Sequence, residues 1–164
     1  MKNNILEIEY YPEYFEDKND WINNIKQNGY SLKYIPKKYI DREMCLMAVK
    51  ENGYALVFIP NKYIDYDICT EAIKSNSLSL CYVPKKYIDK ELCIKAVKGY
   101  GYALEYVPKE YINHEICLEA VKSNGLALEY VPKEYKNKEM CLEAVRNDGE
   151  ALEYVPEEYI DQIK

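Results

Sequence analysis

The seven prolines of this 164-residue chain recur with a constant 24-residue period. Glycines keep the same period from Gly29 to Gly149, with Ser77 in place of one of them. Five of the six cysteines form a third column, nine residues after a proline. Internal periods of roughly 20 to 50 residues are typical of solenoids, in which each unit buries its apolar face against its neighbours. The prolines are Pro12, Pro36, Pro60, Pro84, Pro108, Pro132 and Pro156, and the cysteines of the column are Cys45, Cys69, Cys93, Cys117 and Cys141.

One repeat, from Asp89 to Pro108, contains the signals of two helices. Asp89 is a suitable N-cap, and apolar residues follow it at helical spacing as far as Val97. Gly101 is placed for the left-handed C′ position, which predicts a helix of about 11 residues. Apolar residues three apart then continue to Pro108, which predicts a second, short helix. The residues after the proline predict a turn of α or 3₁₀ helix.

No segment alternates apolar and polar residues over the length of a strand, so the predicted fold class is all-α. We expect an α-solenoid of about six to seven 24-residue repeats, each with one long and one short helix. The chain is predicted to be a single repeat domain (1–164). It divides into a cap-like N-terminal repeat (1–28), regular repeats (29–156) and a C-terminal half repeat (157–164).

The two ends depart from the repeat pattern. Trp21 takes the cysteine column, so we expect the helix Asn19–Gln27 to act as a cap. After the last proline, the next N-cap would be Asp161. The C-terminus is therefore either a short cap or an exposed stacking face, and in the second case it could pair with another copy of the chain.

The string NHEICLEAVKSNGLALEYVP, from Asn113 to Pro132, resembles the bacterial and viral repeat family catalogued as domain of unknown function 4116. Its core motif A-V-K-x-x-G-x-A-L-x-Y-V-P recurs at Ala48–Pro60, Ala96–Pro108 and Ala144–Pro156, with two changes in the first of these copies and one in the last. The resemblance implies an α-helical repeat over nearly the whole chain. It implies no activity, catalytic residue or cofactor. The period is also similar to that of leucine-rich-variant repeats, which alternate an α-helix with a 3₁₀ helix.

Composition excludes several classes of protein. The chain has 22 Lys and Arg against 28 Asp and Glu, a formal net charge of −6. Binding to phosphates requires clustered Lys and Arg, so a nucleic-acid partner is not expected. No apolar run approaches the roughly 18 residues of a membrane span, and the N-terminus lacks the apolar block of a signal peptide. We therefore expect a cytoplasmic protein that does not cross a membrane.

The sequence shows no catalytic or metal-binding pattern, so we expect neither enzymatic activity nor a cofactor. Column cysteines one helix-packing distance apart are too far apart for disulfides, and no C-x-x-C pair occurs. We expect them to be small buried apolar residues. Cys81, outside the column, is expected to be exposed, which leaves a reactive thiol as an alternative. His114, the only histidine, lies in a column of solvated residues.

Candidate binding residues are those that packing does not explain. Fourteen aromatic residues occupy columns two before and three after the prolines, and we expect these to be an inter-repeat packing ladder. Tyrosines that follow the column glycines are predicted to be exposed, and exposed tyrosines are favoured partner contacts; the alternative is that they form a half-covered rim. Lysines after the prolines form a basic ridge, and glutamates form acidic rows. The candidate partner-binding residues are Tyr30, Tyr54, Tyr102, Glu105, Glu129, Glu153, Glu119 and Glu143.

The leading hypothesis is a non-enzymatic interaction module, a rigid helical scaffold that binds another protein. The alternative is a small acidic inhibitor from a phage or mobile element. Such an inhibitor would occupy the nucleic-acid channel of a host defence enzyme by presenting carboxylates in place of phosphates, in the manner of anti-CRISPR proteins. The expected oligomeric state is a monomer, or a homodimer through the C-terminal stacking face.

Overall fold

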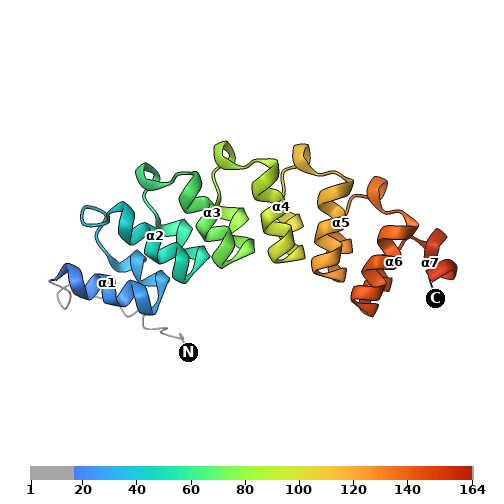
Figure 1. The fold of residues 1–164 in the computed structure, drawn as a ribbon, viewed down its shortest axis with the longest axis horizontal. Coiled ribbons are helices and arrows are strands. Elements are labelled where there is room, and N and C mark those ends of the chain that lie inside the picture. Colours follow the sequence, from blue (N-terminus) through green and yellow to red (C-terminus); the bar gives the residue numbers. More distant parts are fainter. Residues whose placement is uncertain (1–16, 164) are drawn as a thin grey trace, which may run out of the picture.

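Residues 17–163 of the computed structural model form an arch of stacked helical repeats, and no strand occurs in this range (Figure 1). The all-α solenoid expected from the 24-residue period is confirmed. The part of the predicted cap that precedes Asp17 lies outside the described residues. The α-helices are α1 (Lys18–Gln27), α2 (Arg42–Glu51), α3 (Tyr66–Ser75), α4 (Lys90–Gly99), α5 (His114–Ser123), α6 (Lys138–Asn147) and α7 (Glu157–Ile163).

The short helix of each repeat is a 3₁₀ helix of six residues, and a three-residue 3₁₀ turn follows most of the prolines. The six-residue helices are η2 (Gly29–Tyr34), η3 (Gly53–Phe58), η5 (Ser77–Tyr82), η7 (Gly101–Tyr106), η9 (Gly125–Tyr130) and η11 (Gly149–Tyr154). The turns are η4 (Asn61–Tyr63), η6 (Lys85–Tyr87), η8 (Lys109–Tyr111) and η10 (Lys133–Tyr135). Both predicted elements are therefore present.

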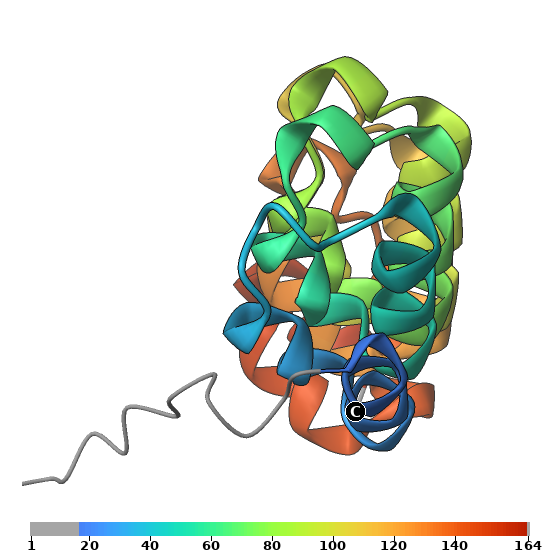
Figure 2. The same cartoon turned by 90° about the vertical axis from the view of Figure 1, so that its left-hand side faces the viewer.

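The solenoid has two layers. From α1 to α6, each α-helix runs from the outer, convex edge of the arch to its inner edge, and the following 3₁₀ helix returns to the outer edge (Figure 1). Seen along the arch, the α-helices form one side and the 3₁₀ helices the other (Figure 2). We call these sides the α face and the 3₁₀ face. The turns after the prolines lie at the outer edge.

Local signals place the helix ends as expected. The Asp89 side chain accepts a hydrogen bond from the Leu92 N–H at 2.8 Å, and equivalent N-caps begin α2, α3, α5 and α6. The Tyr111 hydroxyl donates to the Ile88 carbonyl oxygen of the previous repeat at 3.0 Å, and Tyr87 makes the same bond to Ile64 at 2.7 Å. The column of tyrosines after the prolines is thus an inter-repeat ladder.

The core is one continuous column through the stack. The column cysteines and the alanines three residues after them are fully buried in every regular repeat. Burial raises the pKa of the Cys45 thiol to about 12 and those of Cys69, Cys93 and Cys117 to about 11. These cysteines are therefore apolar packing residues, as predicted.

The column glycines do not have the conformation predicted from the sequence. No glycine among the described residues has a positive φ, so the left-handed C′ assignment is wrong. The junction is instead extended at the residue before the glycine, as at Asn124 (φ −153°, ψ 117°). Gly125 begins η9, and a Cβ there would collide with the Ala144 carbonyl oxygen of the next repeat. Glycine is required here by close approach of two backbones.

Ser77 replaces the glycine of this column, and a neighbouring residue in the next repeat differs too. Gly99 ends α4 at the position that Ser75 and Ser123 hold in other repeats. A Cβ on Gly99 would meet the Ser77 hydroxyl, so glycine at position 99 leaves room for the Ser77 side chain.

At the C-terminal end, α7 begins at Glu157, directly after Pro156. Asp161 lies inside this helix, so the predicted N-cap at Asp161 is wrong. Tyr159, Ile160 and Ile163 are half-buried and pack against the core of the stack.

Candidate interaction surface on the 3₁₀ face

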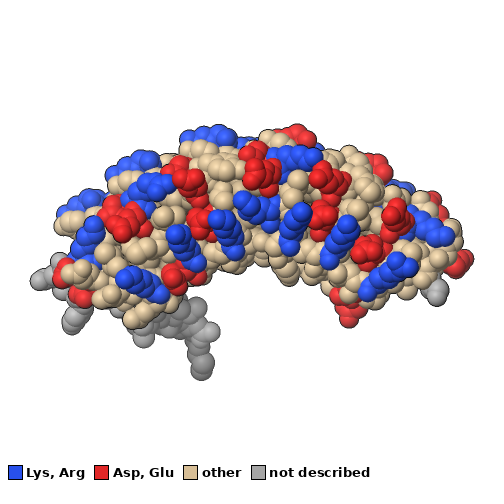
Figure 3. All heavy atoms as spheres, viewed as in Figure 1, with Lys and Arg blue, Asp and Glu red and all other residues tan. Residues whose placement is uncertain are grey.

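The predicted binding residues divide between the two faces. Tyr30, Tyr54, Tyr102, Glu105, Glu129 and Glu153 belong to the 3₁₀ helices, whereas Glu119 and Glu143 lie on α5 and α6. One continuous site therefore cannot include all eight residues. On the α face, Lys and Arg are interleaved with Asp and Glu over the helices (Figure 3). Glu119 pairs there with Lys98 (3.4 Å) and Lys122 (3.6 Å).

The tyrosines at the starts of the 3₁₀ helices are half-buried rather than exposed. The ring of Tyr54 packs edge-on against Tyr82 of the next repeat, with centroids 5.9 Å apart. Tyr102 packs in the same way on Tyr130, and Tyr30 on Phe58, both at 5.7 Å. The prediction that these tyrosines are exposed is thus wrong, because each ring is partly covered by an aromatic ring of the next repeat, as expected for the half-covered rim. More exposed rings lie near the ends of the 3₁₀ helices, at Tyr82 (43%) and Tyr106 (37%).

Shallow grooves recur between successive repeats on the 3₁₀ face. One, of about 460 Å³, is lined by Lys33, Lys37 and Asn61 together with apolar residues. An equivalent groove two repeats further along, of about 450 Å³, is lined by Cys81, Lys85, Lys109 and Glu110. The grooves show that residues three before, one after and two after a proline share one surface. The sequence analysis identified these columns but not that they meet.

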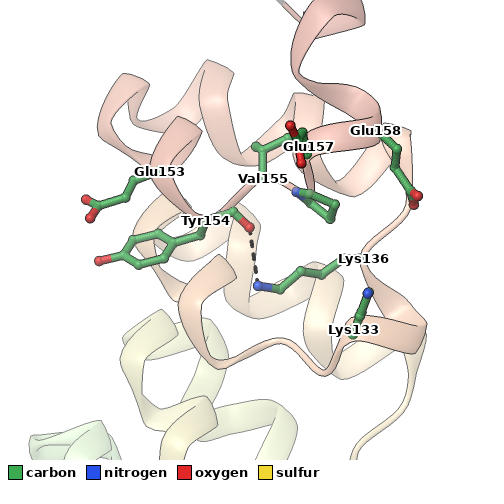
Figure 4. Close-up of a pocket in the computed structure, with 8 residues that line it drawn as sticks. Lys133, Lys136, Glu153, Tyr154, Val155, Glu157 and Glu158 are labelled. Atoms are coloured by element: carbon green, nitrogen blue, oxygen red, sulfur yellow. Dashed lines mark hydrogen bonds between the residues drawn. The ribbon is translucent and has the colours of Figure 1, made fainter.

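The third groove, of about 700 Å³, lies beside α7 and carries the most acidic lining (Figure 4). Lys133, Lys136, Glu153, Glu157 and Glu158 line this groove together with the apolar residues Val155 and Pro156. From the first of these grooves to the third, the charge of the lining therefore changes from basic to acidic.

Glutamates of η7, η9 and η11 help to raise the pKa of neighbouring tyrosine hydroxyls. Glu129 is the largest cause of the raised pKa of Tyr154, with burial and Glu153 contributing less. Burial, followed by Glu129 and Glu105, raises the pKa of Tyr130. Tyrosine rings and glutamates thus form a mixed surface from η7 to η11. Such a surface suits cationic side chains, which gain both a carboxylate partner and an aromatic face.

The sequence analysis also singled out Cys81 and His114. Cys81 is exposed as predicted, but partial burial raises the pKa of its thiol, which lowers its thiolate fraction at neutral pH. His114 is exposed and lies 3.3 Å from the Asn137 side chain. Within residues 17–163, no group of three or more His, Cys, Asp or Glu side chains could hold a metal ion.

Lys136 is the one residue of the third groove that breaks an apolar column. Ile40, Ile64, Ile88 and Ile112 hold the equivalent position in other repeats. The Lys136 ammonium donates to the Tyr154 carbonyl oxygen at 3.3 Å (Figure 4), and partial burial lowers its pKa from 10.5. Burial of a charged group without a carboxylate partner lowers stability.

Lys136→Ile is therefore expected to raise the free energy of unfolding at pH 7 by about 1 kcal/mol. The folded-state pKa lies below 10.5, so the cost of burying the ammonium is complete at neutral pH and is relieved as the pH rises through the folded-state pKa toward 10.5. The gain from isoleucine should accordingly shrink between pH 7 and pH 10. Urea unfolding followed by circular dichroism measures both values. Lys133→Ile, at an exposed site, is the control and should change little; equal effects of the two variants would contradict the interpretation.

The architecture defines the protein as an α-solenoid of 24-residue repeats, each an α-helix followed by a 3₁₀ helix. The model of a domain of unknown function, DUF4116, matches residues 41–88, 65–112, 89–136 and 113–160. These overlapping windows are each offset by one repeat and together span more than half of the chain. The chain belongs to the DUF4116 family. No curated protein and no solved structure matches it.

None of the helices between residues 17 and 163 is long and apolar enough for a membrane span.

Proposed function

We propose that the protein is a non-enzymatic scaffold that binds another protein chain through its 3₁₀ face. One observation carries the proposal: within residues 17–163, all ion pairs lie among the α-helices and their N-caps. The charges of the 3₁₀ face make none of these pairs, and they lie beside exposed tyrosine rings. Rigid elements that present aromatic rings and charges not used in internal ion pairs are suited to recognition.

The spacing of the carboxylates favours a protein partner over the alternative of nucleic-acid mimicry. Glu105, Glu129 and Glu153 supply one charge per repeat, about 8–10 Å apart at the usual helix-packing distance. Duplex DNA carries one negative charge per roughly 1.7 Å of its axis. A row this sparse is a poor copy of a phosphate backbone, whereas its spacing suits separate side chains of a protein.

Two matched variants test the proposal. The first is Glu105→Lys, Glu129→Lys, Glu153→Lys, which we call the 3₁₀-face triple. The second is Glu71→Lys, Glu119→Lys, Glu143→Lys, the α-face triple, which changes the net charge by the same amount in one column of the α-helices.

The measurement is a pull-down from lysate of the native host with each tagged protein, with and without nuclease, quantified by mass spectrometry. The 3₁₀-face triple is expected to retain at least about tenfold less partner than wild type, because several pairs are lost at once. The α-face triple should retain it. Retention that survives the 3₁₀-face triple, or that disappears with nuclease, would contradict the proposal. Circular dichroism confirms that both variants are folded.

A further inference from the structure

The charged columns of the 3₁₀ face change sign at the middle of the solenoid. We define a rung as the three residues that lie three before, one after and two after a proline; all are exposed in the six described rungs. The first three rungs carry charges of +3, +1 and +2, from Lys33, Lys37 and Lys38; Val57, Asn61 and Lys62; and Cys81, Lys85 and Lys86. The last three carry −1, −1 and −3, from Glu105, Lys109 and Glu110; Glu129, Lys133 and Glu134; and Glu153, Glu157 and Glu158.

The tyrosines change their surroundings at the same point. In the first half, lysine ammonium groups lie over the ring of the tyrosine that follows them in the sequence, as Lys38 does over Tyr39 (4.6 Å) and Lys62 over Tyr63 (4.5 Å). Every such contact between described residues precedes residue 88. In the second half the equivalent lysines are replaced by glutamates such as Glu110 and Glu134. The acidic half thus presents phenol rings and carboxylates that could both accept a cation.

A partner for this face needs opposite charges at the same repeat distance. The basic half of the chain presents one to three lysines in each 24-residue repeat, and the acidic half presents two or three glutamates in each repeat of the same geometry. We infer that the partner of the 3₁₀ face is a second copy of this chain, bound antiparallel so that the basic half of each copy covers the acidic half of the other. This inference rests on the proposed function and names the partner of the same surface.

A twofold axis between the rungs of Pro84 and Pro108 produces this pairing. It runs from the outer to the inner edge of the arch, so the outer edges of both copies coincide. Rung charges of +3, +1 and +2 then meet −3, −1 and −1. An isologous interface requires this self-complementarity, because each contact occurs twice. The exposed rings of Tyr82 and Tyr106 lie nearest the axis, where the contacts that dominate binding are usually found.

The face is large enough for a stable dimer. Six rungs at about 9 Å spacing extend over about 45 Å. A standard interface of about 800 Å² per partner then needs a strip about 18 Å wide. A six-residue 3₁₀ helix followed by a three-residue turn covers about that width at roughly 2.0 Å per residue.

Sedimentation equilibrium of the full chain tests the inference. Wild type should approach twice the chain mass of 19.4 kDa at low salt and dissociate as salt is added. The 3₁₀-face triple changes the acidic rungs to charges of +1, +1 and −1, so like charges face each other in two of the three rung pairs, and it should weaken the dimer at least about tenfold. The reversal of one lysine per basic rung, Lys33→Glu, Lys62→Glu and Lys86→Glu, leaves rung charges of +1, −1 and 0 and should weaken the dimer as well. A chain with all six changes has no like charges in facing rungs and should regain dimerisation that the 3₁₀-face triple lacks, which damage to the fold would not allow.

Crosslinking through Cys81 tests the antiparallel arrangement of the two copies. It is the one exposed cysteine of the described residues, and the antiparallel arrangement places the two Cys81 thiols about 10–15 Å apart, one packing distance along the face plus the gap between copies. A bismaleimide of that length should link them into a covalent dimer, and Cys81→Ser should prevent it. A dimer through the C-terminal ends would separate the thiols by more than about 50 Å and would not be linked.

Three results would overturn the inference: a wild-type monomer at every concentration and salt, a dimer that the six-change chain does not restore, or a dimer that Cys81 does not link. A monomer whose 3₁₀-face triple still loses a different protein in the pull-down would leave the proposed function intact and assign the face to that protein. A monomer that retains no protein would overturn both.

Discussion

Leu104→Ala is expected to lower the free energy of unfolding by about 3 kcal/mol. Leu104 lies in η7, is 1% exposed and fills the space between the 3₁₀ helix and the α-helices of its own and the next repeat. The truncation leaves a cavity that the short 3₁₀ helix cannot close by shifting, because close backbone contacts fix its start. Urea unfolding followed by circular dichroism measures the loss.

The position of the loss is as informative as its size. Most contacts in the solenoid join elements of the same or adjacent repeats, so amide protection should fall most in α4, η7 and α5. Leu126→Ala, one repeat later on the half-buried side of η9, is the control and should cost less than about half as much. Equal losses at the two leucines would show that the core does not lie where the structure has it.

Gly125→Ala should destabilise the protein by about 2–3 kcal/mol, because the new Cβ meets the Ala144 carbonyl oxygen and Asp148 backbone of the next repeat. Neither group can rotate away, since both belong to the backbone of the α6–η11 junction. Gly149→Ala is the matched control in the last repeat, where nothing lies within 4 Å of the added methyl group. It should be neutral or slightly stabilising through the unfolded chain.

Thermal unfolding of the Gly125→Ala and Gly149→Ala variants distinguishes two reasons for glycine in this column, a left-handed conformation and the close approach of two backbones. If glycine were needed for a left-handed conformation, both substitutions would destabilise the protein to a similar extent. If close approach is the reason, only Gly125→Ala should lower the melting temperature. A loss at Gly149 as large as at Gly125 would contradict the close-approach explanation.

Much of the fold follows from local signals that repeat. Asp89 and its equivalents cap helices by bonds within three residues, and the proline period sets where each unit ends. Gly125 shows the limit of such reasoning, because a left-handed turn and a close backbone contact both require glycine. Only the position of Ala144 in the next repeat distinguishes them.

The candidate surface was only partly predictable. The sequence identified Glu105, Glu129 and Glu153, but it grouped them with Glu119 and Glu143, which lie on the other face. Exposure of Tyr54 was predicted from its column, whereas its ring is half covered by Tyr82. Which columns share a face depends on the path of the chain between the two layers. The residues whose charges change sign along the rungs can be read from the sequence. The grooves of the structure show that these columns lie on one surface.

Lysine footprinting of the full chain, free and in its complex, distinguishes the two faces most directly. Dilute and associated protein are acetylated briefly with an N-hydroxysuccinimide ester, and each site is quantified by mass spectrometry. An interaction through the 3₁₀ face predicts protection of Lys38, Lys62 and Lys86, with unchanged labelling of the exposed α-face lysines Lys50, Lys74, Lys98 and Lys122. Protection of the α-face lysines with continued labelling of Lys38, Lys62 and Lys86 would place the interaction surface on the opposite side of the solenoid.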